Sequence, residues 1–312
     1  MDGVAVVLSE PESLVLRSLE LTPPGPADVV AEIVWSGIST GTERLLYSGR
    51  MPDFPGMGYP LVPGYESVGW VTAAGPASGR EAGEFAFVPG ARCFGPVRGL
   101  FGGAAARVVV PGTRVLPIPA SLGEDGVLLA LAATAHHAAR AGRAAPELIV
   151  GHGVLGRLLA RVLLATGHEA PVVWERDRSR AAGARGYRVL APEEDDRRDY
   201  RCICDVSGDC GLLDALIARL APGGEIVLGG FYPERLGFSF PPAFLREARL
   251  SVAAQWQPAD LAAVAALVRE AKLLLDGLIT HRSAARSAAQ AYRTAFDDPA
   301  CLKMVLDWRN CS

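Results

Sequence analysis

Short apolar runs separated by glycine and proline fill the first third of the chain. The runs lie at residues 4–8, 29–35, 66–73 and 106–110. Apolar runs of this length between turn residues are typical of β-strands. The pattern predicts a β-rich domain over residues 1–120, in which substrate binding and catalysis are expected.

From residue 121 onward, apolar runs alternate with helical patterns. Strands are expected at 147–151, 171–175, 187–190, 202–206, 224–230 and 249–255. This alternation predicts a doubly wound parallel sheet over residues 121–258. Helical patterns at 258–274 and 286–295 follow, and we expect residues 259–312 to pack back on the first domain because the sheet is then complete. The expected fold class is α/β, with a β-rich domain beside a doubly wound Rossmann domain.

A glycine fingerprint, Gly151-His152-Gly153-Val154-Leu155-Gly156, stands between the apolar run 147–150 and the apolar helical stretch 158–165. In such a turn the first glycine permits the bend, the second lets the backbone approach a pyrophosphate, and the third lets helix pack on strand. The helix N-terminus then offers unpaired N–H groups to phosphates. The residues expected to bind a dinucleotide here are Gly151, Gly153, Val154, Leu155 and Gly156. An ordinary βαβ unit with a glycine turn is the alternative.

An acidic residue ends the next apolar run: Glu175 lies 24 residues after Gly151. A carboxylate there accepts hydrogen bonds from the adenosine ribose and repels a 2′-phosphate, which favours NAD. Arg176 and Arg178 follow at once and keep NADP open as an alternative, so Arg176 is counted among the cofactor contacts.

Composition and charge exclude several classes of protein. The formal charge of −3 gives no reason to expect nucleic acid as a partner. No uncharged apolar run reaches the roughly 18 residues that a membrane helix needs, so no integral membrane segment is expected. The six cysteines contain no C-x-x-C pair, and we expect free thiols in the cytoplasm.

Several motifs resemble those of the medium-chain dehydrogenase/reductase superfamily, in order along the whole chain. Residues 37–43 stand where that superfamily has its first catalytic zinc cysteine, and 62–66 stand where it has Pro-Gly-His-Glu. Residues 130–137 resemble the helix of the third ligand, and 278–282 and 301–306 resemble the tail. The resemblance implies a GroES-like catalytic domain joined to a Rossmann domain.

The zinc ligands of that superfamily are missing. The three ligand positions carry Ser39, Tyr65 and Ala130. A hydroxyl, a phenol and a methyl group do not replace the thiolates and imidazoles that bind catalytic zinc. We therefore expect no metal.

Longer runs resemble one family within the superfamily, the bacteriochlorophyllide a dehydrogenases. These are residues 38–44, 46–51, 54–66, 129–137 and 296–308. The resemblance implies oxidation of the 3-(1-hydroxyethyl) group of a bacteriochlorophyllide to 3-acetyl in bacteriochlorophyll a biosynthesis, with NAD⁺ as acceptor.

A Gly/Pro-rich loop before the second ligand position concentrates large apolar side chains, namely Met51, Phe54, Met57 and Tyr59. Flexible thioethers and flat rings suit a large planar macrocycle. Further candidates for substrate contact are Phe94, Phe231 and Trp256. Packing in the core or at a subunit interface is the alternative for each.

Without zinc, a side chain must take the proton of the substrate hydroxyl. Tyr65 is the first candidate, provided that the cationic nicotinamide or Arg44 lowers its pKa. His136 and His137 compete for the role, since imidazole titrates near neutrality. Ser39 is expected to bond a substrate or nicotinamide oxygen, or else to cap the following helix. A packing role for Tyr65 is the alternative.

The resemblance places Thr134 near the nicotinamide. We also expect cofactor contacts from Ser207 and Gly229, which stand at the ends of the expected strands 202–206 and 224–230.

Two other functions stay open at this point. One is a zinc-free quinone or enoyl reductase that uses NADPH, and the other is a non-catalytic nucleotide-binding sensor or pigment carrier. Residues 250–256 would form a sheet edge, and such an edge predicts a homodimer. Peripheral contact with the photosynthetic membrane also stays open.

Overall fold

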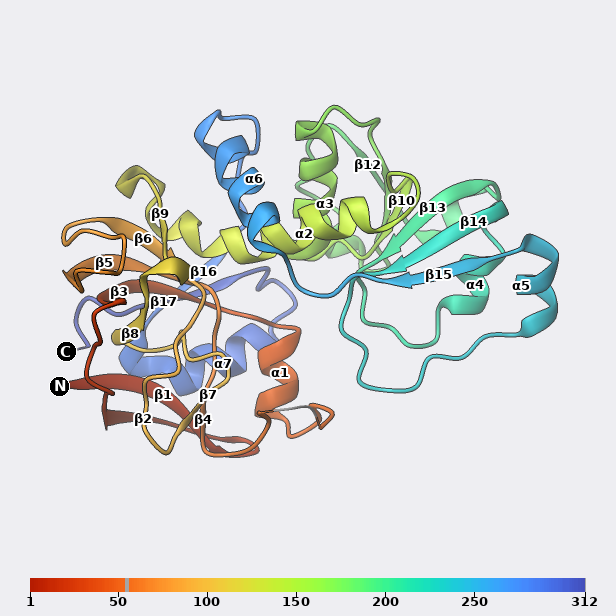
Figure 1. Cartoon of the computed structure of the whole chain (residues 1–312). Helices are drawn as coiled ribbons and strands as arrows, with labels where there is room; N and C mark the ends of the chain where they lie inside the picture. The colour runs from red at the N-terminus through yellow and green to blue at the C-terminus, as the bar shows by residue number, and fades with distance from the viewer. Residues whose placement is uncertain (54–55, 312) are drawn as a thin grey trace. The chain divides into compact units, whose positions relative to one another are not determined.

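The computed structural model describes residues 1–53 and 56–311, and the chain forms two compact units. The first unit comprises Met1–Ala130 and Leu278–Ser312, and the second comprises Leu131–Gly277. The boundaries expected at residues 120 and 258 differ from these. The helix after residue 258 stays with the second unit, and only the last part of the chain joins the first (Figure 1).

Two sheets build the first unit. The larger has the strand order β16-β17-β3-β5-β6-β9, with β8 paired to β3. The smaller has the order β2-β1-β4-β7. The strands of the larger sheet are β3 (Asp28–Ile38), β5 (Ser67–Ala74), β6 (Phe85–Val88), β8 (Arg107–Pro111), β9 (Leu116–Pro117), β16 (His281–Ala284) and β17 (Met304–Asp307). Those of the smaller sheet are β1 (Asp2–Glu10), β2 (Ser13–Glu20), β4 (Leu61–Val62) and β7 (Arg98–Gly99).

The tail of the chain completes this unit. Strand β17 pairs antiparallel with β3, so that Met304 lies opposite Ile38. Helix α7 (Ala288–Asp297) buries Tyr292 and Phe296 in the same core as β3. The helices of the unit are α1 (Thr42–Tyr47), α7 and the 3-10 turns Gly112–Arg114, Ala120–Leu128 and Ala285–Ser287.

The second unit contains the predicted doubly wound parallel sheet. Its strand order is β12-β11-β10-β13-β14-β15 (Figure 1). Successive strands are added on one side of β10 up to β12, and from β13 onward they are added on its other side. The strands are β10 (Leu148–Val150), β11 (Val172–Trp174), β12 (Arg188–Leu190), β13 (Tyr200–Asp205), β14 (Leu220–Leu228) and β15 (Arg249–Val252). The helices are α2 (Leu129–Ala141), α3 (Val154–Ala165), α4 (Leu213–Ile217), α5 (Phe240–Arg246), α6 (Pro258–Arg269) and the 3-10 turns Arg178–Arg180 and Pro192–Glu194.

Burial on both faces explains why the central strand is an unbroken apolar run. All three residues of β10 are buried, as parallel strands covered by helices require. Across residues 1–53 and 56–311, no helix is both long and apolar enough to span a bilayer.

Candidate active site

The glycine turn follows β10 directly and has the geometry that each glycine was expected to provide. Gly151 has φ +103°, a conformation that other residues rarely adopt. A Cβ on Gly156 would lie 1.9 Å from the Gly151 carbonyl oxygen, so the third glycine is required for helix α3 to start there. A Cβ on Gly153 would meet only the end of the Arg180 side chain, at 3.6 Å. The turn therefore leaves room for a pyrophosphate beside Gly153, and the residues present fit a dinucleotide.

Glu175 stands at the end of β11, next to the glycine turn. One carboxylate oxygen accepts the backbone N–H of His152 at 3.2 Å, and the other accepts that of Asp177 at 3.0 Å. These bonds fix the carboxylate beside the turn, where the sequence predicts an adenosine ribose.

Arginine side chains near Glu175 have separate partners. The Arg176 guanidinium lies 3.2 Å from the Asp209 carboxylate, and that of Arg178 lies 3.5 Å from Glu194. Arg180 was missed by sequence reasoning, yet its guanidinium is the group next to Gly153. Arg180 lies five residues after Glu175 in the chain, and that spacing alone does not predict a position beside Gly153.

A buried histidine secures this part of the turn. The His152 ring lies 2.8 Å from the Arg180 carbonyl oxygen and 2.9 Å from the Tyr187 hydroxyl. Arg157 donates to the carbonyl oxygens of both His152 and Arg180. Burial lowers the pKa of His152 to about 4, so the ring is neutral at physiological pH. His152 therefore ties the glycine turn to residue 180 without adding charge at the phosphate site.

The remaining predicted cofactor contacts lie on the second unit. Ser207 follows β13, and its Cα lies 3.2 Å from where a Gly151 Cβ would be. Gly229 follows β14 and donates its N–H to the Asp205 carbonyl oxygen. Thr134 lies on α2 and is half-buried. Ser207 and Gly229 stand at carboxyl ends of parallel strands, the edge at which such sheets bind ligands.

On the first unit, the structure brings together two of the residues that the sequence resemblance places at zinc-ligand positions. The hydroxyl oxygens of Ser39 and Tyr65 lie 2.8 Å apart, and Tyr65 also bonds Thr42. Ser39 follows β3, and Tyr65 lies between β4 and β5. The Tyr65 ring meets Phe101 edge-on, with ring centroids 5.5 Å apart.

The electrostatics of Tyr65 differ from the expectation. The mechanism considered from sequence needs a lowered pKa, with Arg44 as one source. Burial instead raises the pKa of Tyr65 well above its ordinary value, and the Glu66 carboxylate adds to the effect. Arg44 is exposed on α1. Tyr65 is therefore a protonated phenol in the resting protein.

The two competing histidines lie on the second unit and share one carboxylate. Nδ1 of His136 lies 2.7 Å from one Asp260 oxygen, and Nδ1 of His137 lies 3.0 Å from the other. Asp260 lies in the first turn of helix α6, and it was missed because it is 123 positions from His137 in the chain. His136 and Asp260 are both buried. The arrangement joins α2 to α6, a structural role that accounts for both rings.

The predicted substrate residues fall into three groups. Met51 is buried in an apolar cluster with Leu8, Leu46, Leu61 and Leu100, and Met57, Tyr59 and Phe101 pack against that cluster. Phe94 is 2% exposed and lies in the core of the first unit, which leaves no surface for substrate. Phe231 is exposed, Trp256 is half-buried, and Phe54 lies outside the described residues.

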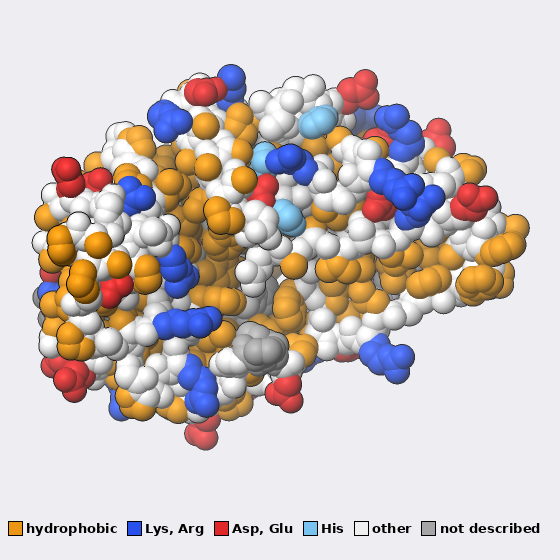
Figure 2. Space-filling view, in the orientation of Figure 1, with side chains coloured by type: hydrophobic (Ala, Val, Ile, Leu, Met, Phe, Trp, Pro, Cys, Tyr) orange, Lys and Arg blue, Asp and Glu red, His pale blue; other side chains and the backbone are white. Residues whose placement is uncertain are grey.

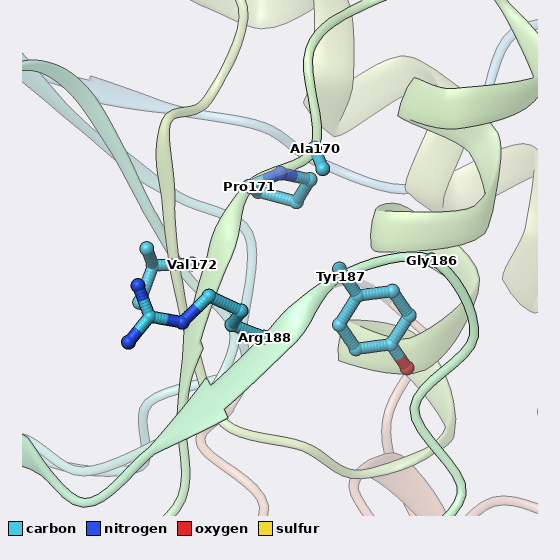
Figure 3. A pocket seen from close by; sticks show the side chains of 6 residues that line it. All are labelled: Ala170, Pro171, Val172, Gly186, Tyr187 and Arg188. Atoms are coloured by element: carbon cyan, nitrogen blue, oxygen red, sulfur yellow. The ribbon is translucent and has the colours of Figure 1, made fainter.

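A hollow elsewhere on the second unit has no part in this site. Its lining residues, Ala170, Pro171, Val172, Gly186, Tyr187 and Arg188, surround the amino ends of β11 and β12 (Figure 3). Because the strands are parallel, that edge is opposite the glycine turn, which follows the carboxyl end of β10.

A zinc ion, which the superfamily implies, does not fit the residues present. The Ser39 and Tyr65 hydroxyls bond each other, and the Ala130 side chain has no donor atom. Throughout the described part of the chain, no three His, Cys, Asp or Glu side chains gather in a way that could hold a metal ion.

Solved structures share the fold of this chain. The chain superposes on 2R,3R-butanediol dehydrogenase from Bacillus subtilis with a TM-score of 0.84 at 19% identity, covering 98% of this chain and 99% of the other. It superposes on a putative zinc-binding dehydrogenase from Sinorhizobium meliloti bound to NADP with a TM-score of 0.81 at 20% identity, over 98% and 99% of the two chains. The chain has the fold of these dehydrogenases, which confirms the predicted fold class.

Sequence relatives define the family. Two curated proteins named 2-desacetyl-2-hydroxyethyl bacteriochlorophyllide A dehydrogenase are each 56% identical to the chain. The one from Rhodobacter capsulatus matches over 312 residues and the one from Cereibacter sphaeroides over 315, with 99% of both chains covered in each case. No protein-family model matches the chain. The chain belongs to the family of 2-desacetyl-2-hydroxyethyl bacteriochlorophyllide A dehydrogenases, and the predicted resemblance is confirmed.

Proposed function

We propose that this dehydrogenase oxidises the hydroxyethyl side chain of a bacteriochlorophyllide to an acetyl group, with NAD⁺ as hydride acceptor and without a metal ion. The identity of 56% over 99% of the chain supports the substrate. The observation that carries the metal-free mechanism is the 2.8 Å contact between Ser39 and Tyr65 at positions where zinc-dependent relatives of this fold have ligands.

The proton of the substrate hydroxyl leaves through Tyr65 in this proposal. Bound nicotinamide supplies the hydride acceptor, and the glycine turn with Glu175 holds the dinucleotide. Because the raised pKa keeps the Tyr65 phenol protonated, it is not a standing base. It accepts the hydroxyl proton only as it passes its own proton along its hydrogen bond to Thr42, whose half-buried hydroxyl in turn releases a proton to solvent water. A relay of this kind needs both hydroxyls in place.

The partly buried side chains of Met57, Tyr59 and Phe101 are the proposed substrate contact on the first unit, and Met51 is buried in the cluster beneath them. These side chains pack on the same cluster, and Phe101 also touches the Tyr65 ring. A planar macrocycle lying on them would bring its side-chain hydroxyl toward the phenol. On the second unit, Phe231 and Trp256 stay separate candidates for substrate contact, because neither is fully buried.

The acceptor in this proposal is NAD⁺ rather than NADP⁺. The carboxylate of Glu175 is fixed beside the glycine turn, where it would accept bonds from ribose hydroxyls and repel a phosphate. We also propose that the reaction takes place in the cytoplasm.

Changing Glu175 to alanine is expected to weaken NAD⁺ binding about tenfold and to bring the affinities for NAD⁺ and NADP⁺ closer together. Charge-assisted bonds to the ribose and repulsion of a 2′-phosphate disappear together. Calorimetric titration of both cofactors measures the ratio. Glu169→Ala, on the surface after α3, is the matched control. An unchanged ratio would show that the arginines near Glu175 set the preference.

A substrate panel tests the proposed function. Purified protein receives a hydroxyethyl bacteriochlorophyllide with NAD⁺ or NADP⁺, and separately a quinone and an enone with NADPH. We expect turnover with the pigment and NAD⁺. Turnover confined to the quinone or enone would make the protein a reductase, and tight pigment binding without turnover in any arm would make it a carrier.

We further propose that two copies of the chain associate through the open edge of the sheet. Strand β15 is the last strand in the order, and Val252 on it is 74% exposed. Helix α5 beside it exposes Phe240, Phe244 and Leu245. Figure 2 shows hydrophobic side chains gathered at the end of the second unit where Figure 1 places α5. An apolar patch next to unpaired strand groups favours a second copy related by a two-fold axis.

Sedimentation is expected to find a dimer, and Val252→Lys is expected to weaken association at least tenfold, because a charged side chain on an edge strand opposes pairing. Val15→Lys, which also alters an exposed valine but on the first unit, is the control. A wild-type monomer at micromolar concentration would refute this interface.

A further inference from the structure

A buried carboxyl group lies directly behind the Ser39–Tyr65 pair. Glu43 is 1% exposed, and one of its carboxylate oxygens accepts the backbone N–H of Ser39 at 3.0 Å. The other accepts the hydroxyl of Tyr292, which comes from helix α7, at 2.5 Å. Since the Ser39 hydroxyl contacts that of Tyr65, a single residue separates Glu43 from the proposed proton acceptor.

A second carboxyl group shares this dry region with one lysine. Glu66 and Lys303 are both almost fully buried and form an ion pair. The Lys303 ammonium also donates to the Ile38 carbonyl oxygen at 3.1 Å. Two carboxyl groups and one ammonium cannot all be ionised without an excess negative charge in a region of low dielectric. The cluster therefore has a place for one exchangeable proton.

The charges around Glu43 favour that proton near neutral pH. Burial raises the pKa of Glu43 from 4.5 to about 7. The hydrogen bonds from Tyr292 and Ser39 oppose this shift, the Glu66 carboxylate adds to it, and Lys303 opposes it. These groups come from α7, from the loop before α1, from the segment before β5 and from the segment before β17.

A local capping role explains only part of this geometry. A carboxylate in the first turn of α1 that accepts an N–H four residues earlier stabilises the start of a helix. Capping needs no buried phenol from α7, 249 residues away in the chain. It also needs no burial, since caps work at the surface.

We propose that Glu43 is a positioning residue for the oxidation described above: its ionised carboxylate holds Ser39, and through Ser39 it holds Tyr65 in the arrangement that takes the substrate proton. This inference rests on the proposed function. Both groups facing the carboxylate, the Ser39 N–H and the Tyr292 O–H, are donors. A protonated Glu43 would present a third hydrogen, so one of the two contacts must break or turn. Ionised Glu43 is thus the competent form.

The pH dependence of kcat/KM tests the proposal. For the wild type we expect an inflection near pH 7, with activity falling several-fold as pH drops through it and then levelling off as Glu43 becomes fully protonated. Glu43→Gln should lower activity several-fold and remove this inflection, because an amide does not titrate. Tyr292→Phe should move the inflection to higher pH, because it removes the hydrogen bond that most opposes the raised pKa. Glu32→Gln, an exposed glutamate on β3, is the control and should leave the profile unchanged.

The resting protein gives a second readout without pigment. The infrared band of a protonated carboxyl should disappear as pH rises through about 7, and it should be absent in Glu43→Gln. The stability of the protein should follow the same ionisation. Because the pKa of Glu43 is higher in the folded chain than its ordinary 4.5, the folded chain binds more protons, and the free energy of unfolding falls as pH rises from 4.5 to about 7. As pH rises across that window, the free energy of unfolding of the wild type should therefore fall relative to that of Glu43→Gln.

The outcomes separate this inference from the function on which it rests. Pigment turnover with the same inflection in wild type and Glu43→Gln would overturn the role of Glu43 and leave the proposed function intact. No pigment turnover by the wild type would refute the proposed function, and the positioning role with it. Loss of the inflection in Glu43→Gln with its upward shift in Tyr292→Phe supports the proposal, since a structural role predicts neither change.

Discussion

Tyr65→Phe is expected to lower kcat by roughly 10²-fold or more, the usual contribution of a positioned acid–base group. Only the phenol oxygen is lost, and the ring keeps its contact with Phe101, so the fold and the affinity for NAD⁺ should be unchanged. Since the missing interaction acts mainly in the transition state, kcat and kcat/KM should fall together. Stopped-flow formation of NADH with the pigment measures the effect.

Three variants serve as controls for this result. Tyr47→Phe removes another phenol of the first unit, on a ring that packs against Phe296, and should cost little in kcat. His136→Ala and His137→Ala remove the imidazoles that share Asp260, and their effect should appear mainly in stability. A small loss of kcat in Tyr65→Phe, with a nearly inactive histidine variant, would show that this imidazole accepts the proton. Small losses of kcat in Tyr65→Phe and in both histidine variants would show that water or a group of the substrate accepts the proton.

Gly156→Ala is expected to abolish measurable dinucleotide binding or to weaken it by at least tenfold. The new Cβ would lie 1.9 Å from the Gly151 carbonyl oxygen, so the turn or helix α3 must move. Forced overpacking typically costs about 1–3 kcal/mol, and tenfold in affinity corresponds to about 1.4 kcal/mol. Alanine is a better helix former than glycine by up to about 1 kcal/mol, which offsets only part of that strain.

Gly237→Ala is the matched control in the same unit. No atom lies within 4 Å of the Cβ it would add, so binding and thermal stability should stay as in the wild type. NADH fluorescence titration gives the affinity, and thermal unfolding shows whether the fold persists. Wild-type affinity in Gly156→Ala would mean that the dinucleotide does not depend on this turn.

The parts of the fold that the sequence predicts are those set by local pattern. The run Leu148–Val150 is apolar because both of its faces are buried, and the glycines after it are required by the backbone of the turn. The boundary near residue 258 was harder to predict from the sequence, because a helical pattern does not show on which unit the helix packs. Helix α6 stays in the second unit, where Asp260 binds two histidines of α2.

The sequence indicated individual residues of the candidate site, but it did not predict which of them contact one another. Ser39 and Tyr65 stand out because they replace ligands, whereas their contact depends on tertiary structure. The direction of the Tyr65 pKa depends on burial and on Glu66, and neither is visible in the chain. Phe94 was expected to contact substrate, whereas the structure buries it in the core of the first unit. An apolar residue in a loop does not show from sequence alone whether it lies at the surface or in the core.

The central claim is metal-free oxidation of the hydroxyethyl group with NAD⁺ as acceptor, and one stoichiometric measurement tests it. Protein dialysed against a chelator is mixed with NAD⁺ and with pigment deuterated at the carbinol carbon, and the absorption spectrum and the reduced nicotinamide are followed together. We expect the long-wavelength pigment band to move to the red as the acetyl group joins the conjugated system, with one deuterated NADH formed for each acetyl group. Unchanged pigment under these conditions, with conversion restored by added zinc, would contradict the account.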